Sequence, residues 1–262
     1  MNDLADLLDE AEAAPVDGWD FGWFDGRATE ERPPWGYARL LGERLRTAAA
    51  VLDVQTGGGE VFREALSSSC TADACPTTVA ATESWPPNAA LARAALTPFG
   101  ATVALAADDA PLPFAAGAFD LVCSRHPTVV GWSEIARVLT PGGTYFAQHV
   151  GPRSASALTD FMMGPQPVGD GRSVARDRAG AAAAGLEVVD VREATLRLEF
   201  FDVAAVAVYL RKVIWIVPGF TITRYRRRLE LMHELIGREG SFTATTTRHL
   251  IECRKPHAVD GR

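Results

Sequence analysis

The chain has few cysteines, and they do not form the pattern of a zinc site. Its 262 residues include four, Cys70, Cys75, Cys123 and Cys253. Cysteine zinc sites use closely spaced pairs such as C-x-x-C, matched by a second pair or by histidines. The sequence contains no such arrangement, so we predict no metal site. Because the thiols of a cytoplasmic protein stay reduced, we also expect no disulfide.

The chain also has fewer basic than acidic residues. The 26 Lys and Arg residues are outnumbered by 33 Asp and Glu residues, which gives a formal net charge of -7 at pH 7. Binding to nucleic acid through a general basic surface requires clustered Lys and Arg, so we expect no nucleic-acid partner. The one dense basic run, residues 224–228, precedes Glu230, Glu234 and Glu239. This run predicts a solvated helix face with ion pairs, and a phosphate site is the alternative.

No apolar run has the length and continuity of a membrane span. The most apolar segment, residues 200–220, is interrupted by Asp202, Arg211 and Lys212 and ends at Pro218. A spanning helix needs about 20 predominantly apolar residues. We therefore expect no membrane association and interpret this segment as a buried helix. The N-terminal residues are acidic where a secretory signal is basic, which predicts a cytoplasmic protein.

A glycine cluster follows the first strongly apolar run. Residues 51–60 read VLDVQTGGGE, a pattern typical of a strand that turns into a helix around a ligand. The dinucleotide motif G-x-G-x-x-G fails here, because its third glycine falls on Phe62. Glu60 would oppose an anionic pyrophosphate at the helix N-terminus but suits a cation. The loop therefore favours S-adenosylmethionine, which carries a sulfonium and an ammonium, and an ordinary turn is the alternative.

Further β-prone runs alternate with helical segments along the chain. They lie at residues 78–83, 102–107, 119–124, 144–147, 185–191 and 247–253. Strands that alternate with helices predict a parallel, doubly wound sheet with ligands at the carboxyl ends of its strands. Glu83 stands at such an end, where this fold places the carboxylate that binds ribose hydroxyls.

The order of these segments resembles the class I S-adenosylmethionine-dependent methyltransferases, in particular the small-molecule branch called methyltransferase type 11. The resemblance covers residues 36 to 150. It rests on the glycine loop, on Glu83, on Asp108 before Leu112-Pro113-Phe114, on the strand at 119–122, and on residues 134–143. The implied fold is an α/β, Rossmann-like, doubly wound seven-stranded sheet, mostly parallel with an antiparallel last strand, with helices on both faces.

The resemblance also implies roles for individual residues. Gly57 and Gly59 would pass close to the methionine part of the cofactor, Glu83 would hold the ribose diol, and Asp108 would meet the adenine amino group. The family's usual glycine is replaced by Gln55, so the first turn must accommodate a side chain. The candidate cofactor-binding residues are Asp53, Gln55, Gly57, Gly59, Glu60, Glu83, Ser84, Trp85, Asp108, Asp109, Ser124 and Arg125.

Two histidines are candidates for a general base. Methyl transfer is an in-line displacement, so the protein has to align the nucleophile, exclude water and, if needed, remove one proton. His126 follows the carboxyl end of the fourth strand, near the reversal of strand order, and the resemblance implies that it faces the methyl group. His149 follows the fifth strand. A structural hydrogen-bonding role is the alternative for each.

Aromatic residues gather in two segments outside the resemblance. We expect residues 1–45 to form an N-terminal helical cap, and residues 46–262 to form the Rossmann-like methyltransferase domain with a lid insertion near 153–240. Aromatic rings in the cap and lid would line an apolar substrate site or fill the core. Arg125 and Arg153 are expected at the sheet edge that carries the carboxyl ends of the strands. They would bind a substrate carboxylate or phosphate, or pair with neighbouring acids. The candidate substrate-binding residues are Trp23, Trp35, Tyr37, Arg153, Tyr209 and Trp215.

Together these features predict a cytoplasmic methyltransferase with S-adenosylmethionine as donor and S-adenosylhomocysteine as product. Its partner would be a small, partly apolar molecule methylated at oxygen, nitrogen or carbon. An RNA base methyltransferase is one alternative, which the acidic charge and the missing zinc cysteines disfavour. A protein that binds S-adenosylmethionine without methyl transfer is the other, suggested by Gln55. The substrate and the oligomeric state are not readable from the sequence.

Overall fold

The computed structural model describes residues 3–16, 21–70, 75–167, 169 and 171–257. The chain forms two compact units. The sheet unit comprises residues 33–151, 170–194 and 248–262, and the helical unit comprises residues 1–32, 152–169 and 195–247. The segment expected as a cap is therefore divided at residue 32, and its residues 17–20 lie outside the described part. That residues 153–240 act as a lid stays a prediction.

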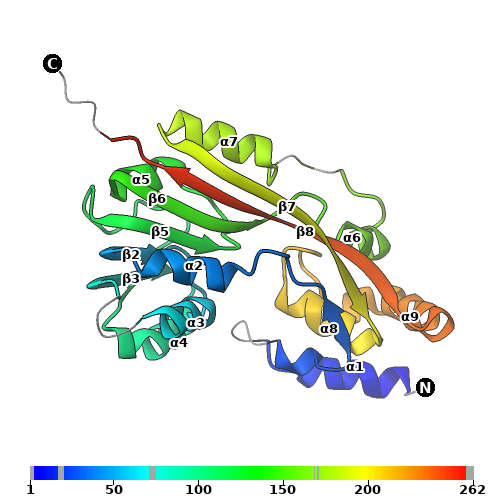
Figure 1. Cartoon of the computed structure of the whole chain (residues 1–262). Helices are drawn as coiled ribbons and strands as arrows, with labels where there is room; N and C mark the ends of the chain where they lie inside the picture. The colour runs from blue at the N-terminus through cyan, green and yellow to red at the C-terminus, as the bar shows by residue number, and fades with distance from the viewer. Residues whose placement is uncertain (1–2, 17–20, 71–74, 168, 170, 258–262) are drawn as a thin grey trace. The chain divides into compact units, whose positions relative to one another are not determined.

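The sheet unit is built on seven strands, in the order β7-β8-β6-β5-β2-β3-β4 (Figure 1). The strands β2, β3, β4, β5 and β6 pair in parallel, whereas β8 runs antiparallel to β6. Their bounds are β2 (Ala50–Asp53), β3 (Thr78–Glu83), β4 (Thr102–Leu105), β5 (Phe119–Arg125), β6 (Leu139–Val150), β7 (Glu187–Phe200) and β8 (Phe242–Arg254). The prediction of a mostly parallel sheet with an antiparallel last strand is confirmed.

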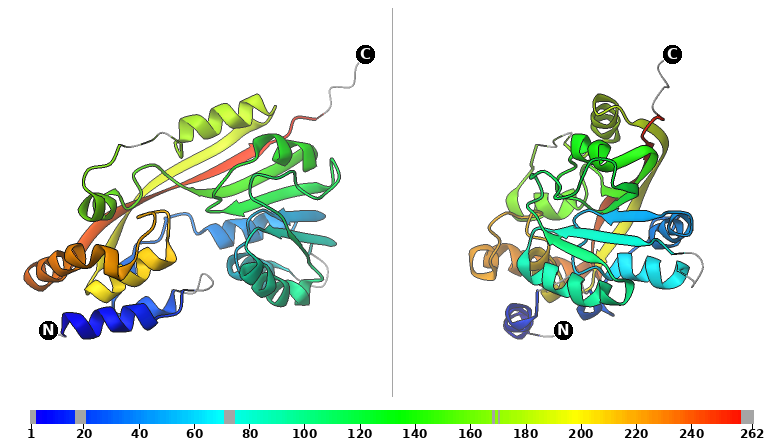
Figure 2. Two further views of the ribbon diagram at one scale, coloured as in Figure 1. Left: turned by 180° about the vertical axis from the view of Figure 1, so that it is seen from behind. Right: turned by 90° about the vertical axis from the view of Figure 1, so that its left-hand side faces the viewer.

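Helices cover both faces of this sheet (Figures 1 and 2). They are α2 (Tyr37–Leu45), α3 (Glu60–Ser69), α4 (Pro86–Leu96), α5 (Trp132–Val138), α7 (Val174–Ala183) and the short 3-10 helix η2 (Thr97–Phe99). Val51 of β2 packs in a buried cluster with α2, α3 and α4, while the adjacent Leu52 packs in a second cluster with α5 and α7. Neighbouring strand residues point to opposite faces, so the continuous apolar pattern of β2 reflects burial on both sides.

The start of β2 is fixed by a side chain from β5. Asp120 accepts hydrogen bonds from the backbone N–H groups of Ala49 and Ala50, each at 2.8 Å. This contact joins the two central strands at the end opposite the glycine loop. In the observed parallel register, the carboxyl ends of β2 and β5 lie at the same edge of the sheet.

The helical unit contains an eighth strand that the sequence analysis did not predict. β1 (Ala28–Glu30) pairs antiparallel with Leu198, Glu199 and Phe200 of β7. Three residues are too few to show the alternation of apolar and polar side chains that predicts a strand, so only the pairing with β7 defines β1. The other elements of this unit are α1 (Leu4–Ala13), η1 (Gly22–Phe24), α6 (Ser156–Met163), α8 (Val203–Lys212) and α9 (Ile222–Glu239).

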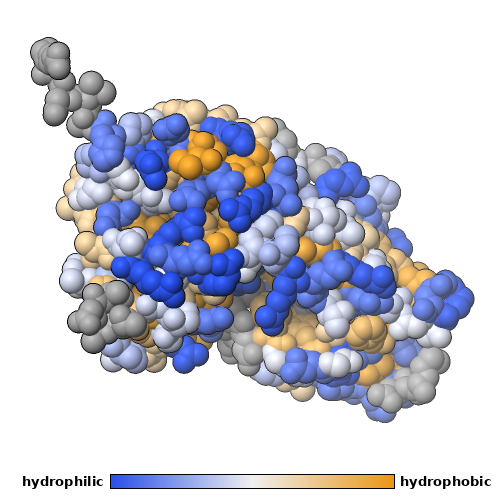
Figure 3. Space-filling model, viewed as in Figure 1, coloured by the Kyte–Doolittle hydropathy of each residue, from blue (hydrophilic) through white to orange (hydrophobic). Residues whose placement is uncertain are grey.

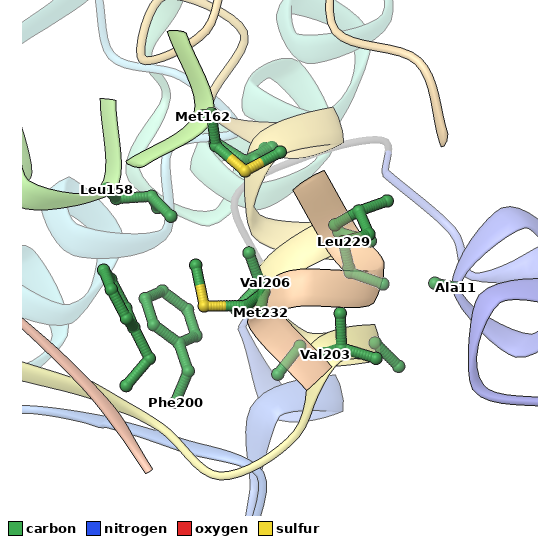
Figure 4. Close-up of a cluster of buried hydrophobic side chains, with 14 of the residues drawn as sticks. Ala11, Leu158, Met162, Phe200, Val203, Val206, Leu229 and Met232 are labelled. Carbon is green, nitrogen blue, oxygen red and sulfur yellow. The ribbon is translucent and has the colours of Figure 1, made fainter. Parts of the chain in front are cut away.

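The core of the helical unit forms around α8, whose residues are almost all buried (Figure 4). Val203 and Val206 of α8 lie among Phe200, Leu229 and Met232, which come from β7 and α9. The predicted buried helix within residues 200–220 is thus present. None of the helices in the described part of the chain is long and apolar enough to cross a membrane.

The basic run on α9 forms part of the predicted helix-surface ion pairing, with Glu230. Glu230 lies 3.6 Å from Arg226 and 3.0 Å from Arg227. All three side chains are partly exposed to solvent, so these pairs contribute little to stability. Across the face seen in Figure 3, hydrophilic residues predominate and apolar residues form separate patches.

The expectation that the chain has no disulfide is wrong. Cys70 and Cys75 are bonded, with their Cα atoms 4.6 Å apart. Both residues lie between α3 and β3 in the sequence. Spacing alone did not reveal this pair, because a five-residue separation also occurs in ordinary turns. Cys123 and Cys253 are buried free thiols.

The packing of the helical unit predicts the cost of truncating one of its residues. Leu229→Ala should lower the free energy of unfolding by about 2–5 kcal/mol, because the side chain is fully buried and its removal leaves a cavity. Chemical denaturation measures this loss. The matched control is Ile214→Ala, since Ile214 is 64% exposed and its truncation should change stability by at most about 0.5 kcal/mol. Equal effects of the two substitutions would contradict this description of the core.

Candidate functional site

The glycine loop connects β2 to α3 and contains three residues with left-handed backbone. Gln55, Gly57 and Gly59 have φ values of 57°, 65° and 82°. The loop is held to β3 by Thr82, which accepts hydrogen bonds from the N–H groups of Gln55 (to Oγ1, 3.2 Å) and Thr56 (to the carbonyl, 2.9 Å). A Cβ at Gly59 would lie 3.3 Å from Cα of Ala92 on α4. Both the backbone angle and this close approach therefore favour glycine.

Glu83 ends β3 with its carboxylate fixed by backbone donors. Oε2 accepts from the N–H of Gly57 at 2.8 Å, and Oε1 accepts from the N–H of Trp85 at 2.9 Å. Burial raises the pKa of Glu83, and these N–H groups act in the opposite direction. A carboxylate offers about four lone-pair sites, so about two remain for ligand hydroxyls. The structure therefore brings Gly57, in the loop after β2, into contact with Glu83 at the end of the adjacent parallel strand β3.

Gln55 bridges the glycine loop to the segment that follows β5. Its Nε2 donates to the carbonyl of Val129 at 2.7 Å, and its Oε1 accepts from the N–H of Thr128 at 2.7 Å. The Thr128 hydroxyl also lies at hydrogen-bond distance from Gln55 Oε1 and from the carboxylate of Asp108. A hydroxyl has one proton, and the shorter contact to the charged oxygen indicates that it goes to Asp108. These bonds stabilise a non-glycine residue in the left-handed region.

Two of the candidate cofactor residues are instead engaged within the sheet. Asp53 is buried, with its Oδ1 3.4 Å from Cys123 Sγ, and burial raises its pKa to about 6. Ser124 is also buried and donates to the carbonyl of Val54 at 2.7 Å. Their polar atoms serve contacts between β2 and β5.

The remaining candidate cofactor residues lie around the same loops. Glu60 stands in the first turn of α3 and folds back over Gly58, so that a Cβ there would lie 2.3 Å from Glu60 Oε1. Trp85 is 44% exposed and precedes α4. Three other candidates have exposed side chains, namely Ser84, Asp109 and Arg125.

His126 is held in one hydrogen-bonding state by its neighbours. Trp35 donates its indole N–H to Gln148 Oε1 at 2.7 Å, which leaves the amide N–H₂ of Gln148 facing His126 Nε2 at 2.9 Å. Nε2 of His126 must therefore accept, and in the neutral ring the proton sits on Nδ1. Burial lowers the pKa of His126 well below its usual value, which keeps the ring neutral. The Nε2 lone pair that a base would use is already occupied.

Trp35 and Tyr37 anchor the segment before α2. Trp35 donates to Gln148, as described above, and its side chain is only 5% exposed. Tyr37 donates to the carbonyl of Ser124 at 3.1 Å and stacks on Phe146 with ring centroids 5.4 Å apart. Both are core residues of the sheet unit, which favours the core alternative over substrate contact.

The other predicted substrate residues belong to the helical unit. Trp23 packs against Phe24, and the guanidinium of Arg27 lies 4.3 Å from the Trp23 ring centroid. Tyr209 makes edge contacts with Phe24 and Phe200. Trp215 is 39% exposed, and Arg153 has a left-handed backbone with φ 61°. That these residues contact a substrate stays a prediction.

His149 is part of a buried cluster that only the folded structure assembles. Asp177 Oδ2 lies 2.6 Å from His149 Nδ1 and 2.6 Å from His249 Nε2. Burial opposes ionisation of Asp177, but the hydrogen bonds from both histidines outweigh it and hold its pKa at about 2. The carboxylate can only accept, so His149 Nδ1 donates, and its Nε2 accepts from the hydroxyl of Tyr145 at 3.0 Å. Burial also lowers the pKa of His149.

This cluster lies in the wall of a cavity of about 510 Å³ within the sheet unit. Sequence reasoning identified His149 but missed Asp177 and His249. They come from α7 and β8, and no local spacing links the three residues. The cavity is lined by Pro127, Thr128, Val129, Val130, Trp132, His149, Val150, Gly171, Arg172, Arg176, Asp177, Ala179, Gly180 and His249.

The family model described as "Methyltransferase domain", of the type 11 group, matches residues 52–147. That range contains the glycine loop, Glu83, Asp108 and His126. Residues 52–147 thus match a methyltransferase domain, as the sequence resemblance to the class I, type 11 family implies. The resemblance drawn from the sequence is confirmed.

Solved structures share the fold of this methyltransferase domain at low sequence identity. A candidate methyltransferase from Bacillus halodurans is 16% identical, with a TM-score of 0.57 over 84% of this chain and 98% of that one. The YcgJ protein from Bacillus subtilis is 14% identical, with a TM-score of 0.58 over 85% and 99%. The cyclase SpnF is 16% identical, with a TM-score of 0.52 over 97% and 93%. None of the curated proteins compared matches the sequence.

The burial of Asp53 predicts a pH-dependent penalty to folding. In the folded protein the pKa of the Asp53 carboxyl is about 6, against 3.8 for the ordinary group. The ionised carboxylate therefore destabilises the fold fully above about pH 6, and this penalty is absent below pH 3.8. By linkage the difference approaches about 3 kcal/mol. Relative to the wild type, Asp53→Asn should therefore gain stability as the pH rises from 4 to 7. Denaturant unfolding across that range measures the effect, and parallel pH profiles of the two proteins would show that the Asp53 pKa is not raised.

Proposed function

We propose that this protein is an S-adenosylmethionine-dependent methyltransferase that acts on an oxygen, nitrogen or carbon of a small molecule. The observation that carries the proposal is the Glu83 carboxylate, fixed by the N–H groups of Gly57 and Trp85 at the carboxyl end of β3. Two vicinal hydroxyls of a ribose fit the lone pairs that these donors leave. The match of residues 52–147 to the methyltransferase family supports the same cofactor.

The chain's residues fit S-adenosylmethionine better than a dinucleotide. Glu60 places a carboxylate in the first turn of α3, where a pyrophosphate needs bare N–H groups. Phe62 stands at the third glycine position of the dinucleotide motif and is buried. Gly57 and Gly59 would bring the backbone close to the amino-acid part of the cofactor, and Asp108 would accept from the adenine amino group. S-adenosylmethionine would supply a methyl group already activated by its sulfonium.

The cavity near the carboxyl ends of β5 and β6 supports a small-molecule acceptor. Its volume of about 510 Å³ lies within the range of about 300–1,000 Å³ that small ligands occupy. Trp132 and Val130 supply apolar lining, whereas Arg172 and Arg176 supply cationic groups. The protein would orient the acceptor there and exclude water from it. An RNA substrate is less consistent with the net charge of -7.

The second candidate function is binding of S-adenosylmethionine without methyl transfer. The hydrogen bonding of the two predicted bases favours it, because the acceptor lone pairs of His126 and His149 are both occupied. The fold itself does not decide, since SpnF is a cyclase. Release of S-adenosylhomocysteine from S-adenosylmethionine in the presence of an acceptor would exclude this candidate.

Substitution of Glu83 tests the cofactor site. Glu83→Ala should weaken binding of S-adenosylhomocysteine by about 100-fold or more, because it removes two hydrogen bonds to a charged group that contribute about 1.5–3 kcal/mol each. Calorimetric titration measures the affinity. Glu64→Ala is the matched control, because Glu64 is an exposed carboxylate on α3. Unchanged affinity of the Glu83 variant would show that this carboxylate does not hold the ribose.

A further inference from the structure

The His149, Asp177 and His249 side chains converge on one point from three elements. His149 on β6 is the register partner of His249 on β8, and their ring centroids lie 5.1 Å apart. Asp177 on α7 places a single oxygen, Oδ2, 2.6 Å from a nitrogen of each ring. All three residues are buried, and the three donor atoms lie within 4.8 Å of one another.

We propose that His149, Asp177 and His249 bind one divalent transition-metal ion. Two imidazoles and one carboxylate are a ligand set that Zn²⁺ and Fe²⁺ accept, with further positions left open for water or substrate. The sequence-based prediction of no metal considered cysteine patterns, and this site uses none. Among the described residues this is the one group of three such ligands that converges in this way.

Binding an ion would require the three ligand atoms to spread around it. A tetrahedral ion with bonds of about 2.0–2.1 Å keeps its ligand atoms about 3.3 Å apart, so each distance from Oδ2 to a ring nitrogen would lengthen by about 0.7 Å from 2.6 Å. The two ring nitrogens, which lie within 4.8 Å of each other, would take the same separation. The ion would take the place of the protons on His149 Nδ1 and His249 Nε2. The positive charge of the ion would then compensate the buried carboxylate, which without metal accepts hydrogen bonds from two ring N–H groups.

Tyr145 supplies the partner that a metal-bound His149 requires. A ligating histidine usually donates its second ring N–H to a hydrogen-bond acceptor, which orients the ring. The fully buried Tyr145 hydroxyl lies 3.0 Å from His149 Nε2 and can accept from it when Nδ1 binds the ion. The hydroxyl thus suits both states of the ring, as donor without metal and as acceptor with it.

The position of the site in the cavity wall connects it to the proposed function, on which this step rests. Coordination positions not taken by protein would face the cavity that we assign to the acceptor. A metal ion lowers the pKa of a bound hydroxyl. Such a hydroxyl would lose its proton to water and attack the methyl group as an alkoxide. It would therefore need no free histidine, and the hydrogen bonds of His126 and His149 leave neither histidine free.

Metal titration of the full chain tests the site without cofactor or substrate. The purified protein is treated with chelator, returned to metal-free buffer and titrated with Zn²⁺ by calorimetry and with Co²⁺ by visible absorption. We expect one equivalent of each ion to bind. Tyr145→Phe should lower the affinity by about 10- to 100-fold, since it removes the partner of His149.

Two variants separate metal binding from a purely structural role. His249→Gln keeps an amide donor near the position of Nε2, so Asp177 remains hydrogen-bonded and the fold is retained, but metal affinity should be lost. Circular dichroism confirms folding. His233→Ala is the matched control, because His233 on α9 lies in the helical unit and should leave binding unchanged.

Either of two outcomes would overturn the proposal: the wild type binds no Zn²⁺ or Co²⁺, or His249→Gln binds them as the wild type does. The first result would leave the three residues as a hydrogen-bonded cluster, and the second would place the metal elsewhere. Binding of S-adenosylhomocysteine is measured in a separate titration that needs no metal. Failure of the metal site is therefore distinguishable from failure of the proposed cofactor site.

Discussion

The candidate site depends on the bond between the Glu83 carboxylate and the backbone N–H of Gly57. Both groups lie at the carboxyl ends of neighbouring parallel strands, so the bond exists only when β2 and β3 pair in the observed register. It fixes the glycine loop and aligns the carboxylate at the same time. The left-handed Gly57 and Gly59 and the close approach of α4 to Gly59 lie directly beside this bond.

The same edge of the sheet carries two further polar systems. The bridge from Gln55 to Thr128 and Asp108 joins the glycine loop to the segment after β5. The cluster of His149, Asp177 and His249 lies beyond that segment, in the wall of the cavity. The residues that resemble the family therefore lie next to a cluster of which two members, Asp177 and His249, lie outside the resemblance. The metal site that we propose would add metal assistance to the proposed methyl transfer.

The strands and the glycine loop could be predicted from sequence because each carries a local pattern, an apolar run that ends in glycine or an acid. Glu83 was found in this way. Asp177 and His249 could not be found, because their relation to His149 is set by the packing of α7 and β8 on the sheet. The roles of Trp35 and His126 were equally hidden, since the orientation of Gln148 links them. The three-residue β1 is defined only by its pairing with β7.

A crystal structure of the protein with S-adenosylhomocysteine tests the central claim most directly. The account predicts both ribose hydroxyls within hydrogen-bond distance of Glu83, with the Gly57 N–H still bonded to the same carboxylate and the adenine amino group near Asp108. A ligand whose ribose lies away from Glu83, or crystals that take up no ligand at saturating concentration, would contradict it.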